Sequence, residues 1–268
     1  MKQIDAIAGI LIAALKTVAF FLLITILIPI ALLFRRIDPE HPFRIPQFFH
    51  FLLLNLLGIS LHLHGEPSPA SPVLFASNHT SYLDAIVLGY LLPAGFVAKA
   101  EVADWPLFGL LSKLQNCVFV ERRSTRAAEQ RSQLKDYLTN KHDLVLFPEG
   151  TSSEGLTALP FKSSLFSLAE DSMGGKTLTV QPVSVTCVEL DGFPMLREER
   201  AQYGWYGDMA LVPHLWNVFQ HSSFTVDVVF HTPLTVADYP NRKDLAAACQ
   251  KAVAQGIKQS LARRDSSI

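Results

Sequence analysis

The sequence predicts an α/β fold, with a mostly parallel sheet flanked by helices, preceded by an N-terminal membrane helix and a second amphipathic or interfacial helix. Two observations lead to this prediction. A long apolar run occupies the N-terminal part of the chain, and in the remainder short β-branched or apolar runs alternate with longer helical patterns. Strands that alternate with helices form parallel sheets, because each helix carries the chain back to the starting edge of the sheet.

The composition excludes several classes of protein. Of the 268 residues, 49% are hydrophobic and 18% are charged, against about 25% charged residues in an average soluble domain. Lys and Arg number 23 and Asp and Glu 24, for a net charge of -1, so we expect no nucleic-acid partner. The three cysteines are too few for a disulfide framework and lack the spacing of a zinc site, so we also expect no metal.

The N-terminal apolar run covers residues 6–34 and contains a single charge, Lys16. The 18 uncharged residues that follow Lys16 are enough for a membrane-spanning candidate. A signal peptide has a shorter apolar core and a small-residue cleavage site, which favours a retained anchor here. Because Arg35 and Arg36 follow the run, the positive-inside rule places the rest of the chain in the cytoplasm. We therefore expect a protein of the cell inner membrane.

A second apolar stretch, residues 48–59, is short for a membrane span, and its sequence alone leaves open whether it spans the bilayer. It suits a helix that lies in the membrane interface, and a buried core helix is the alternative. A breaker rich in proline and serine follows at residues 66–72. These features divide the chain into a membrane-anchoring helical module at residues 1–65 and a globular domain at residues 66–268.

The globular part reads as an alternation of strands and helices. Strands are predicted at residues 73–77, 95–98, 117–121, 144–147, 179–185 and 225–230. Helices are predicted at residues 81–92, 106–114, 125–139, 161–170 and 243–262. Parallel sheets of this kind bind their ligands beyond the carboxyl ends of the strands, so the residues that follow each strand are the candidates for chemistry.

His79 and Asp84 follow the first of these strands, in the turn that leads to a helix. A histidine can accept a proton from a hydroxyl at neutral pH, and a carboxylate on its second ring nitrogen holds the reactive tautomer. The spacing alone is weak, because about one such His-x4-acid pair is expected by chance. Ser81 and Asp84 also match a capping box, in which Asp84 would do no more than cap the helix.

A second turn follows strand 144–147 and contains Glu149, Gly150 and Thr151. Glycine lets backbone N–H groups approach an oxyanion closely. The alternative is an ordinary surface turn, which is the commonest use of such residues.

Together these residues resemble the glycerolipid acyltransferase family, the lysophosphatidic acid acyltransferases. The resemblance rests on Asn78-His79-x4-Asp84 and on residues 147–151, in the order the family shows. Residues 116–122, which end in Arg122, and residues 180–185, around Pro182, resemble two further blocks of the family. The resemblance spans roughly residues 70–190.

The resemblance implies a membrane-associated enzyme that moves an acyl group from a thioester to the free hydroxyl of a lysolipid. His79 would be the general base and Asp84 its orienting partner. Glu149, Gly150 and Thr151 would bind the acceptor. The anionic group of the substrate would be held by three cations, Arg122, Lys99 and Lys162. The alternative for each of them is a solvated charge on the protein surface.

The resemblance also implies partners. The donor would be acyl-acyl carrier protein or acyl-coenzyme A, with no further cofactor, and the acceptor would be a membrane lipid, primarily 1-acylglycerol-3-phosphate, which becomes phosphatidic acid. The alternatives are a non-enzymatic membrane scaffold, which needs neither His79 nor Asp84, and a hydrolase, which needs an activated nucleophile.

One departure from the family pattern concerns the acceptor. Ser152 stands where the family usually has an arginine after Thr151, and serine cannot bind a phosphate with a bidentate fork. Residues 204–208 and 213–216 add a second unusual feature, although Trp205 and Trp216 also suit packing or interfacial anchoring. With the serine, these segments resemble a bacterial branch that includes lyso-ornithine lipid acyltransferases, which makes lyso-ornithine lipid the alternative acceptor.

Overall fold

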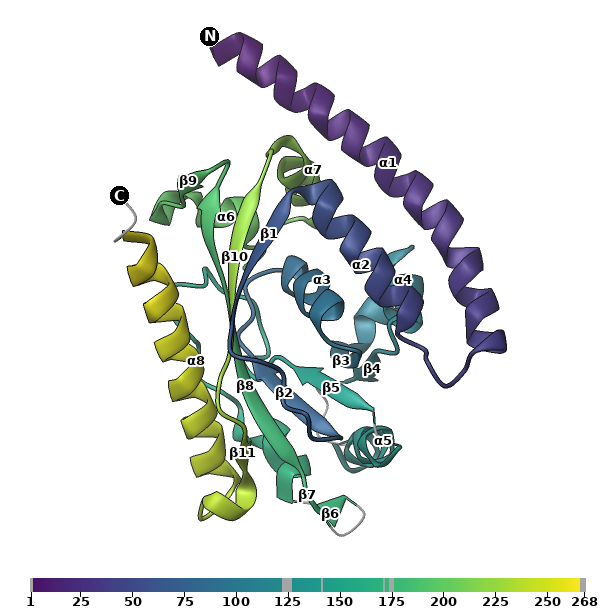
Figure 1. Cartoon of the computed structure of the whole chain (residues 1–268), viewed down its shortest axis with the longest axis vertical. Helices are drawn as coiled ribbons and strands as arrows, with labels where there is room; N and C mark the ends of the chain where they lie inside the picture. The colour runs from purple at the N-terminus through teal and green to yellow at the C-terminus, as the bar shows by residue number, and fades with distance from the viewer. Residues whose placement is uncertain (1, 122–126, 141, 171, 174–175, 266–268) are drawn as a thin grey trace.

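The computed structural model describes residues 2–121, 127–140, 142–170, 172–173 and 176–265. Within them one sheet has the strand order β1-β10-β8-β2-β5-β3-β4, and two short strands, β9 and β11, pair with β8 (Figure 1). The strands of this sheet are β1 (Ile59–His64), β2 (Val73–Ser77), β3 (Ala94–Lys99), β4 (Val118–Val120), β5 (Asp143–Leu146), β8 (Thr179–Leu190), β9 (Phe193–Pro194), β10 (Phe224–Phe230) and β11 (Leu234–Thr235). A separate hairpin joins β6 (Ser172–Met173) and β7 (Lys176–Thr177).

The sheet is mostly parallel, as predicted. β2 pairs in parallel with β5 and β8, β3 pairs in parallel with β4 and β5, and β1 pairs in parallel with β10. β10, β9 and β11 run antiparallel to β8. All five residues of β2 are buried, because this strand lies in the middle of the sheet with helices on both sides. The carboxyl ends of β2 and β5 therefore meet at the same edge.

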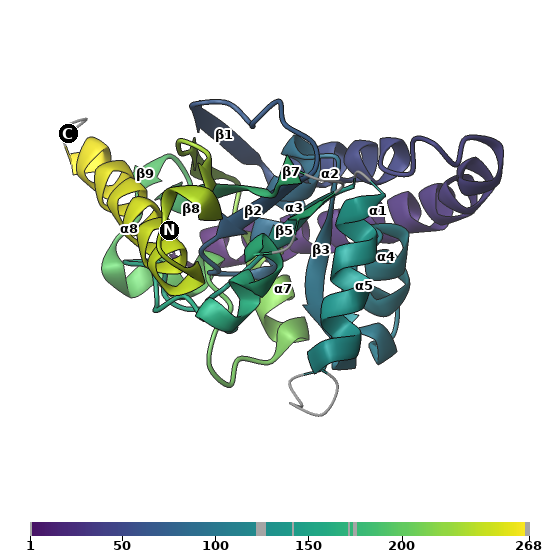
Figure 2. The same ribbon diagram turned by 90° about the horizontal axis from the view of Figure 1, so that it is seen from below.

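Helices cover both faces of the sheet (Figure 2). α8 (Arg242–Asp265) packs along β8 and shares one apolar cluster with α5 (Ala127–Thr139). The other cluster contains residues of α1 (Lys2–Ile37), α2 (Arg44–Leu57) and α3 (Tyr82–Leu91). The remaining α-helices are α4 (Phe108–Leu114), α6 (Arg200–Tyr203) and α7 (Leu211–Gln220).

The strand and helix predictions can be compared with these bounds. All six predicted strands are present, and β8 continues to Leu190, beyond its predicted end at residue 185. The helix predicted at residues 161–170 is a 3₁₀ helix, η3 (Ser163–Glu170). β1, α6, α7 and the short strands β6, β7, β9 and β11 were not predicted. β1 precedes residue 65, so the sheet extends into the segment assigned above to the membrane-anchoring module.

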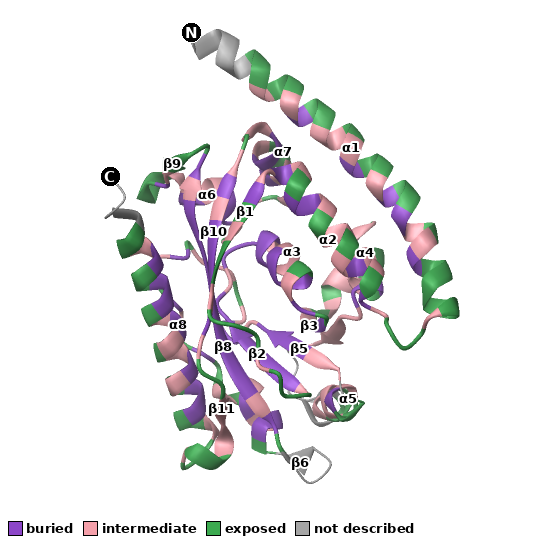
Figure 3. Ribbon diagram, viewed as in Figure 1, coloured by how far each residue is buried: buried purple, intermediate pink, exposed green. Residues whose placement is uncertain are grey.

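α1 is long and apolar enough to cross a membrane. One face packs on the rest of the protein through small and large apolar side chains, and the opposite face is apolar and exposed (Figure 3). The buried residues of this helix are Ala13, Phe20, Ile24, Leu27 and Ala31. A soluble helix exposes charged residues on its outer face, so the composition of α1 fits association with a membrane.

α2 has features of both a core helix and an interfacial helix, the two alternatives given above for the second apolar stretch. Leu53, Leu54 and Leu57 are buried against the domain, which is the core-helix interpretation. Phe48 and Phe51 are exposed, which leaves an apolar surface for the membrane interface.

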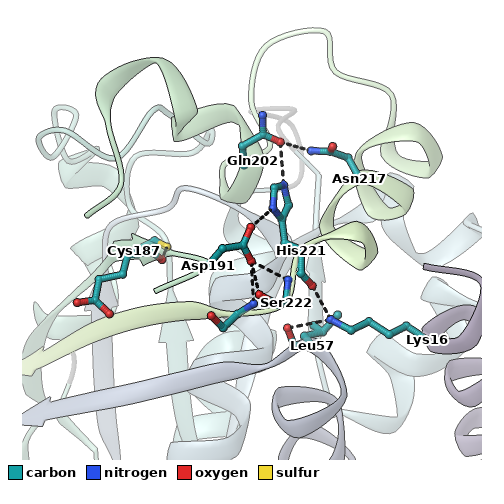
Figure 4. A network of polar contacts seen from close by, with 10 residues as sticks. Lys16, Leu57, Cys187, Asp191, Gln202, Asn217, His221 and Ser222 are labelled. Carbon is teal, nitrogen blue, oxygen red and sulfur yellow. Dashed lines mark hydrogen bonds and ion pairs between the residues drawn. The ribbon is translucent and has the colours of Figure 1, made fainter. Parts of the chain in front are cut away.

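The single charge within the apolar run of α1 lies at the junction with the domain. Lys16 Nζ donates to the carbonyl oxygen of His221 at 2.7 Å and to that of Leu57 at 3.4 Å (Figure 4). These carbonyls lie at the carboxyl ends of α7 and α2, where the helix dipoles favour a cation. The His221 ring in turn contacts Asp191 at 2.8 Å. Lys16 thus joins α1 to two elements of the domain.

Candidate active site

The loop between β2 and α3 is held at its start by Asn78. The side chain of Asn78 accepts a hydrogen bond from Val185 N at 2.9 Å and donates one to Val185 O at 2.8 Å. This pair of bonds continues the pairing of β2 with β8 one residue beyond the last strand residue, Ser77. The next residue, His79, is therefore presented at the carboxyl end of a buried strand.

His79 and Asp84 form the pair that their spacing suggested. His79 Nδ1 lies 3.0 Å from Asp84 Oδ2, and Asp84 is fully buried. Asp84 Oδ2 also accepts hydrogen bonds from the backbone N–H groups of Thr80 at 2.6 Å and Ser81 at 2.8 Å. A carboxylate only accepts, so the proton of the His79 ring resides on Nδ1, and Nε2 keeps a lone pair that can take a proton.

The capping interpretation of Asp84 is also correct. The Ser81 hydroxyl accepts from Leu83 N, and Asp84 binds the backbone of Ser81, which completes a capping box. Asp84 therefore both caps α3 and contacts His79, because the backbone donors at the start of α3 bind the same carboxylate oxygen that His79 contacts.

The His79 ring lies against the second loop. It stacks on Phe147 with a centroid separation of 4.1 Å and an interplanar angle of 20°. Ser153 N donates to the carbonyl oxygen of His79 at 3.0 Å, which ties the two loops together. The side chain of His79 remains 23% exposed, and the residue lines the large cavity described below. A substrate can therefore reach the ring.

The second loop turns sharply after β5. Gly150 has a φ of +68° and its N–H donates to Phe147 O at 3.0 Å, a left-handed conformation that favours glycine. Lys162 N donates to Pro148 O at 3.0 Å, which brings the Lys162 side chain beside Gly150. The structure therefore places Gly150, Thr151 and Lys162 together on the wall of the cavity that His79 lines.

Glu149 lies beneath this loop and not on the cavity wall. Its side chain is 3% exposed, and Oε1 accepts a hydrogen bond from Leu159 N at 3.1 Å. Oε2 has no hydrogen-bond partner among the described residues. Burial, with a smaller contribution from the negative charge of Asp84, raises the pKa of Glu149 to about 8. In this geometry Glu149 supports the loop from below, and its role in acceptor binding stays a prediction.

Two of the three candidate cations have described positions. Lys99 ends β3 and Lys162 follows the second loop, and both side chains are exposed on the lining of the cavity. Arg122 lies outside the described residues. Ser152, the departure from the family pattern, also lines the cavity.

The cavity itself has a volume of about 1210 Å³ and extends from His79 to α1. Its wall near the membrane helix is apolar. It is formed by side chains of α1, α2 and α4: Phe20, Ile24, Leu27, Phe49, Leu53, Phe108 and Leu111. Such a wall binds hydrocarbon and excludes water, so the structure joins a lipid-binding space to a proton acceptor.

One residue in contact with the pair was missed in the sequence. Tyr203, in α6, donates its hydroxyl to Asp84 Oδ1 at 3.1 Å across 119 positions of chain. Two further bonds join this segment to the loop between β2 and α3 and to α3 itself. Trp205 N donates to Thr80 O at 2.9 Å, and the Tyr82 hydroxyl lies 3.0 Å from His214 Nδ1. No local signal marked Tyr203, because its role depends on tertiary contacts alone.

Comparisons with known proteins identify the family. The profile of the family described as Acyltransferase matches residues 60–186. The lyso-ornithine lipid O-acyltransferase of Brucella abortus is 36% identical over 89% of this chain and 91% of its own length. The 1-acyl-sn-glycerol-3-phosphate acyltransferase of Neisseria gonorrhoeae is 32% identical over 74% of this chain and 73% of its own.

A solved structure supports the fold. The crystal structure of the 1-acyl-sn-glycerophosphate (LPA) acyltransferase from Thermotoga maritima superposes with a TM-score of 0.67. The alignment covers 92% of this chain and 95% of that one, at 20% sequence identity.

Proposed function

The chain belongs to the acyltransferase family of the lyso-ornithine lipid and 1-acyl-sn-glycerol-3-phosphate acyltransferases, and from this premise we propose how its site transfers an acyl group to a lysolipid. The observation that carries the proposal is the His79–Asp84 pair at the end of an apolar cavity. The scaffold alternative gives no reason for this arrangement.

In the proposed reaction His79 Nε2 takes the proton of the lysolipid hydroxyl as its oxygen attacks the thioester carbonyl carbon. The carbon–sulfur bond then breaks, and the departing thiolate receives the proton from the His79 imidazolium. Asp84 holds the ring and stabilises its positive charge while the proton resides there. No covalent intermediate on the protein is needed.

The donor proposed is an acyl thioester of acyl carrier protein or of coenzyme A. The apolar wall formed by α1, α2 and α4 offers space for the acyl chain, whose thioester would lie near His79. The opposite face of α1 is apolar and exposed, which suits contact with lipid beside the cavity.

Two acceptors are proposed, each on its own observation. Lyso-ornithine lipid is favoured by Ser152, which lines the cavity where an arginine would hold a phosphate, and by relatives of that name that match most of the chain. The phosphate-bearing 1-acylglycerol-3-phosphate is favoured by Lys99 and Lys162, which line the same cavity. Charge on the headgroup is what separates the two.

The location proposed is the cell inner membrane, with the domain on the cytoplasmic side. The apolar face of α1 supports association with a membrane, and Arg35 and Arg36 at its end support this orientation. Protease added outside intact spheroplasts should leave a C-terminal tag uncut, and cleavage of the tag would reverse the orientation.

An acceptor panel tests the function. The purified full chain in lipid vesicles receives one labelled acyl donor and, in separate reactions, lyso-ornithine lipid and 1-acylglycerol-3-phosphate. Label should appear in the diacylated product of at least one acceptor, and kcat/KM ranks the two. Transfer to neither, with acyl carrier protein and coenzyme A donors both tried, would refute the proposal.

A further inference from the structure

We infer that Tyr203 is a positioning residue of the active site, whose hydroxyl fixes the plane of the Asp84 carboxylate that holds His79. The inference rests on the proposed roles of His79 and Asp84. Tyr203 lies outside residues 60–186, to which the family profile extends.

The hydrogen bonds of Asp84 divide between its two oxygens. Oδ2 accepts hydrogen bonds from His79 Nδ1 and from the backbone N–H groups of Thr80 and Ser81, all within five positions of Asp84. Oδ1 accepts a hydrogen bond from the Tyr203 hydroxyl. The carboxylate can rotate about its Cβ–Cγ bond, and the three local donors resist this rotation through one oxygen only. A bond to the second oxygen sets its plane, and with it the direction in which Oδ2 meets the His79 ring.

Tyr203 is itself held rigidly. Its side chain is 1% exposed, and its ring packs edge-on against Phe224 with centroids 5.8 Å apart. Arg200, at the start of the same helix, donates to Cys187 O at 2.7 Å. On the other side of Tyr203, Trp205 N is bound to Thr80 O in the catalytic loop. The hydroxyl is therefore anchored to β8, to β10 and to the loop that it supports.

The chemistry of the contact requires a donor. Asp84 is fully buried, and a buried charge with an unsatisfied oxygen is costly. Burial and the negative charge of Asp84 raise the pKa of Tyr203 well above its ordinary value, so the phenol keeps its proton and donates it. Tyrosine supplies this proton without adding a charge that would compete with the His79 imidazolium.

The test is Tyr203→Phe, which removes the hydroxyl and keeps the ring. Because hydrogen bonds to charged groups are strong, we expect kcat per folded enzyme to fall about 10- to 100-fold with KM unchanged. Folded enzyme is measured by circular dichroism in the same vesicles. Tyr137→Phe removes a hydroxyl on α5, which packs in the other apolar cluster, and should keep the wild-type kcat.

A double-mutant cycle separates positioning from general stability. In an Asp84→Asn background, Tyr203→Phe should change kcat less than about twofold, because the two residues act on His79 as one unit. Val253→Ala opens a cavity under α8, in the other apolar cluster, and leaves Tyr203 and its packing intact, so it should lower the melting temperature and leave kcat nearly unchanged.

Three results would overturn the inference: a wild-type kcat in Tyr203→Phe, an equal fall in both backgrounds, or a change confined to KM. His79→Ala, assayed in parallel, tells this failure from that of the proposed function. If His79→Ala is inactive and Tyr203→Phe is not impaired, only the role of Tyr203 is wrong. If His79→Ala keeps its turnover, the proposed mechanism itself fails.

Discussion

The two loops of the candidate active site follow neighbouring parallel strands, yet they are built differently. After β2, the hydrogen-bonding capacity of Asp84 is used within the protein, by His79, by two backbone N–H groups and by Tyr203. After β5, Thr151 and Ser152 face the cavity, and Glu149 below them keeps one oxygen without a partner among the described residues. In the first loop the carboxylate that holds His79 is saturated within the protein, although Thr80 Oγ1 beside it has no partner among the described residues. The second loop presents Thr151 and Ser152 to the cavity, where a ligand can reach them.

This difference suggests a division of labour. A catalytic base needs one orientation, so its supports must be saturated before substrate arrives. A headgroup site must offer donors and acceptors that the protein does not consume. Substitutions in the first loop should therefore change the rate with either acceptor alike, whereas substitutions on the cavity wall of the second should change the choice of acceptor.

The largest effect is expected from the first loop. His79→Ala removes the base and should lower kcat about 10²- to 10⁴-fold with both acceptors, while the protein still folds and reaches the membrane. The measurement is label transfer in vesicles, normalised to folded enzyme. His62→Ala, on the exposed side of β1, is the matched control and should keep wild-type turnover. Turnover near wild type in His79→Ala would contradict the role of this loop.

A smaller and selective effect is expected from the second loop. Ser152→Arg restores the bidentate fork, so the ratio of kcat/KM for 1-acylglycerol-3-phosphate to that for lyso-ornithine lipid should rise about tenfold or more. The zwitterionic headgroup gains less from an added cation.

The matched control for Ser152→Arg places the same charge elsewhere. Thr157 is exposed and lies outside the cavity lining, so Thr157→Arg reports only the general attraction of a cation for an anionic lipid. A ratio unchanged by Ser152→Arg, or changed equally by Thr157→Arg, would show that position 152 does not face the headgroup.

Much of this site was accessible from the sequence because its first loop is local. His79, Asp84 and the capping residue Ser81 lie within six positions, and a strand-to-helix turn brings them together whatever surrounds it. The strands were equally accessible, since β-branched and apolar runs mark them directly.

The remaining features depend on long-range contacts. Tyr203 reaches Asp84 only because α6 packs beneath β10, and no spacing rule connects residues 119 positions apart. β1 alternates apolar and polar residues, as a half-buried strand does, but it was missed because it lies before the proline- and serine-rich breaker, in the segment assigned to the membrane-anchoring module. The burial of Glu149 beneath the loop was also invisible, because Pro-Glu-Gly-Thr reads as a surface turn.

The smallest expected effect is that of a substitution at Glu149 on the pH dependence of the free energy of unfolding. Its pKa of about 8 in the folded protein exceeds the ordinary value of 4.5. Between these values the unfolded chain releases the proton and the folded protein keeps it, so the free energy of unfolding decreases as pH rises, and above about pH 8 the loss is complete. Glu149→Gln keeps the acceptor for Leu159 N and removes this titration.

The expected result is a variant whose advantage over the wild type grows with pH. Thermal unfolding at pH 5 and pH 8.5 should show Glu149→Gln gaining stability relative to wild type at the higher pH, by an amount on the order of a few kcal/mol at most. Glu154→Gln, the same change at an exposed position of the same loop, should leave the pH dependence unaltered. If Glu149 is instead ionised and binds the acceptor directly, Glu149→Gln would raise KM and show no growing advantage. The second loop would then contact its ligand through a buried charge, and the contrast between the two loops would have to be abandoned.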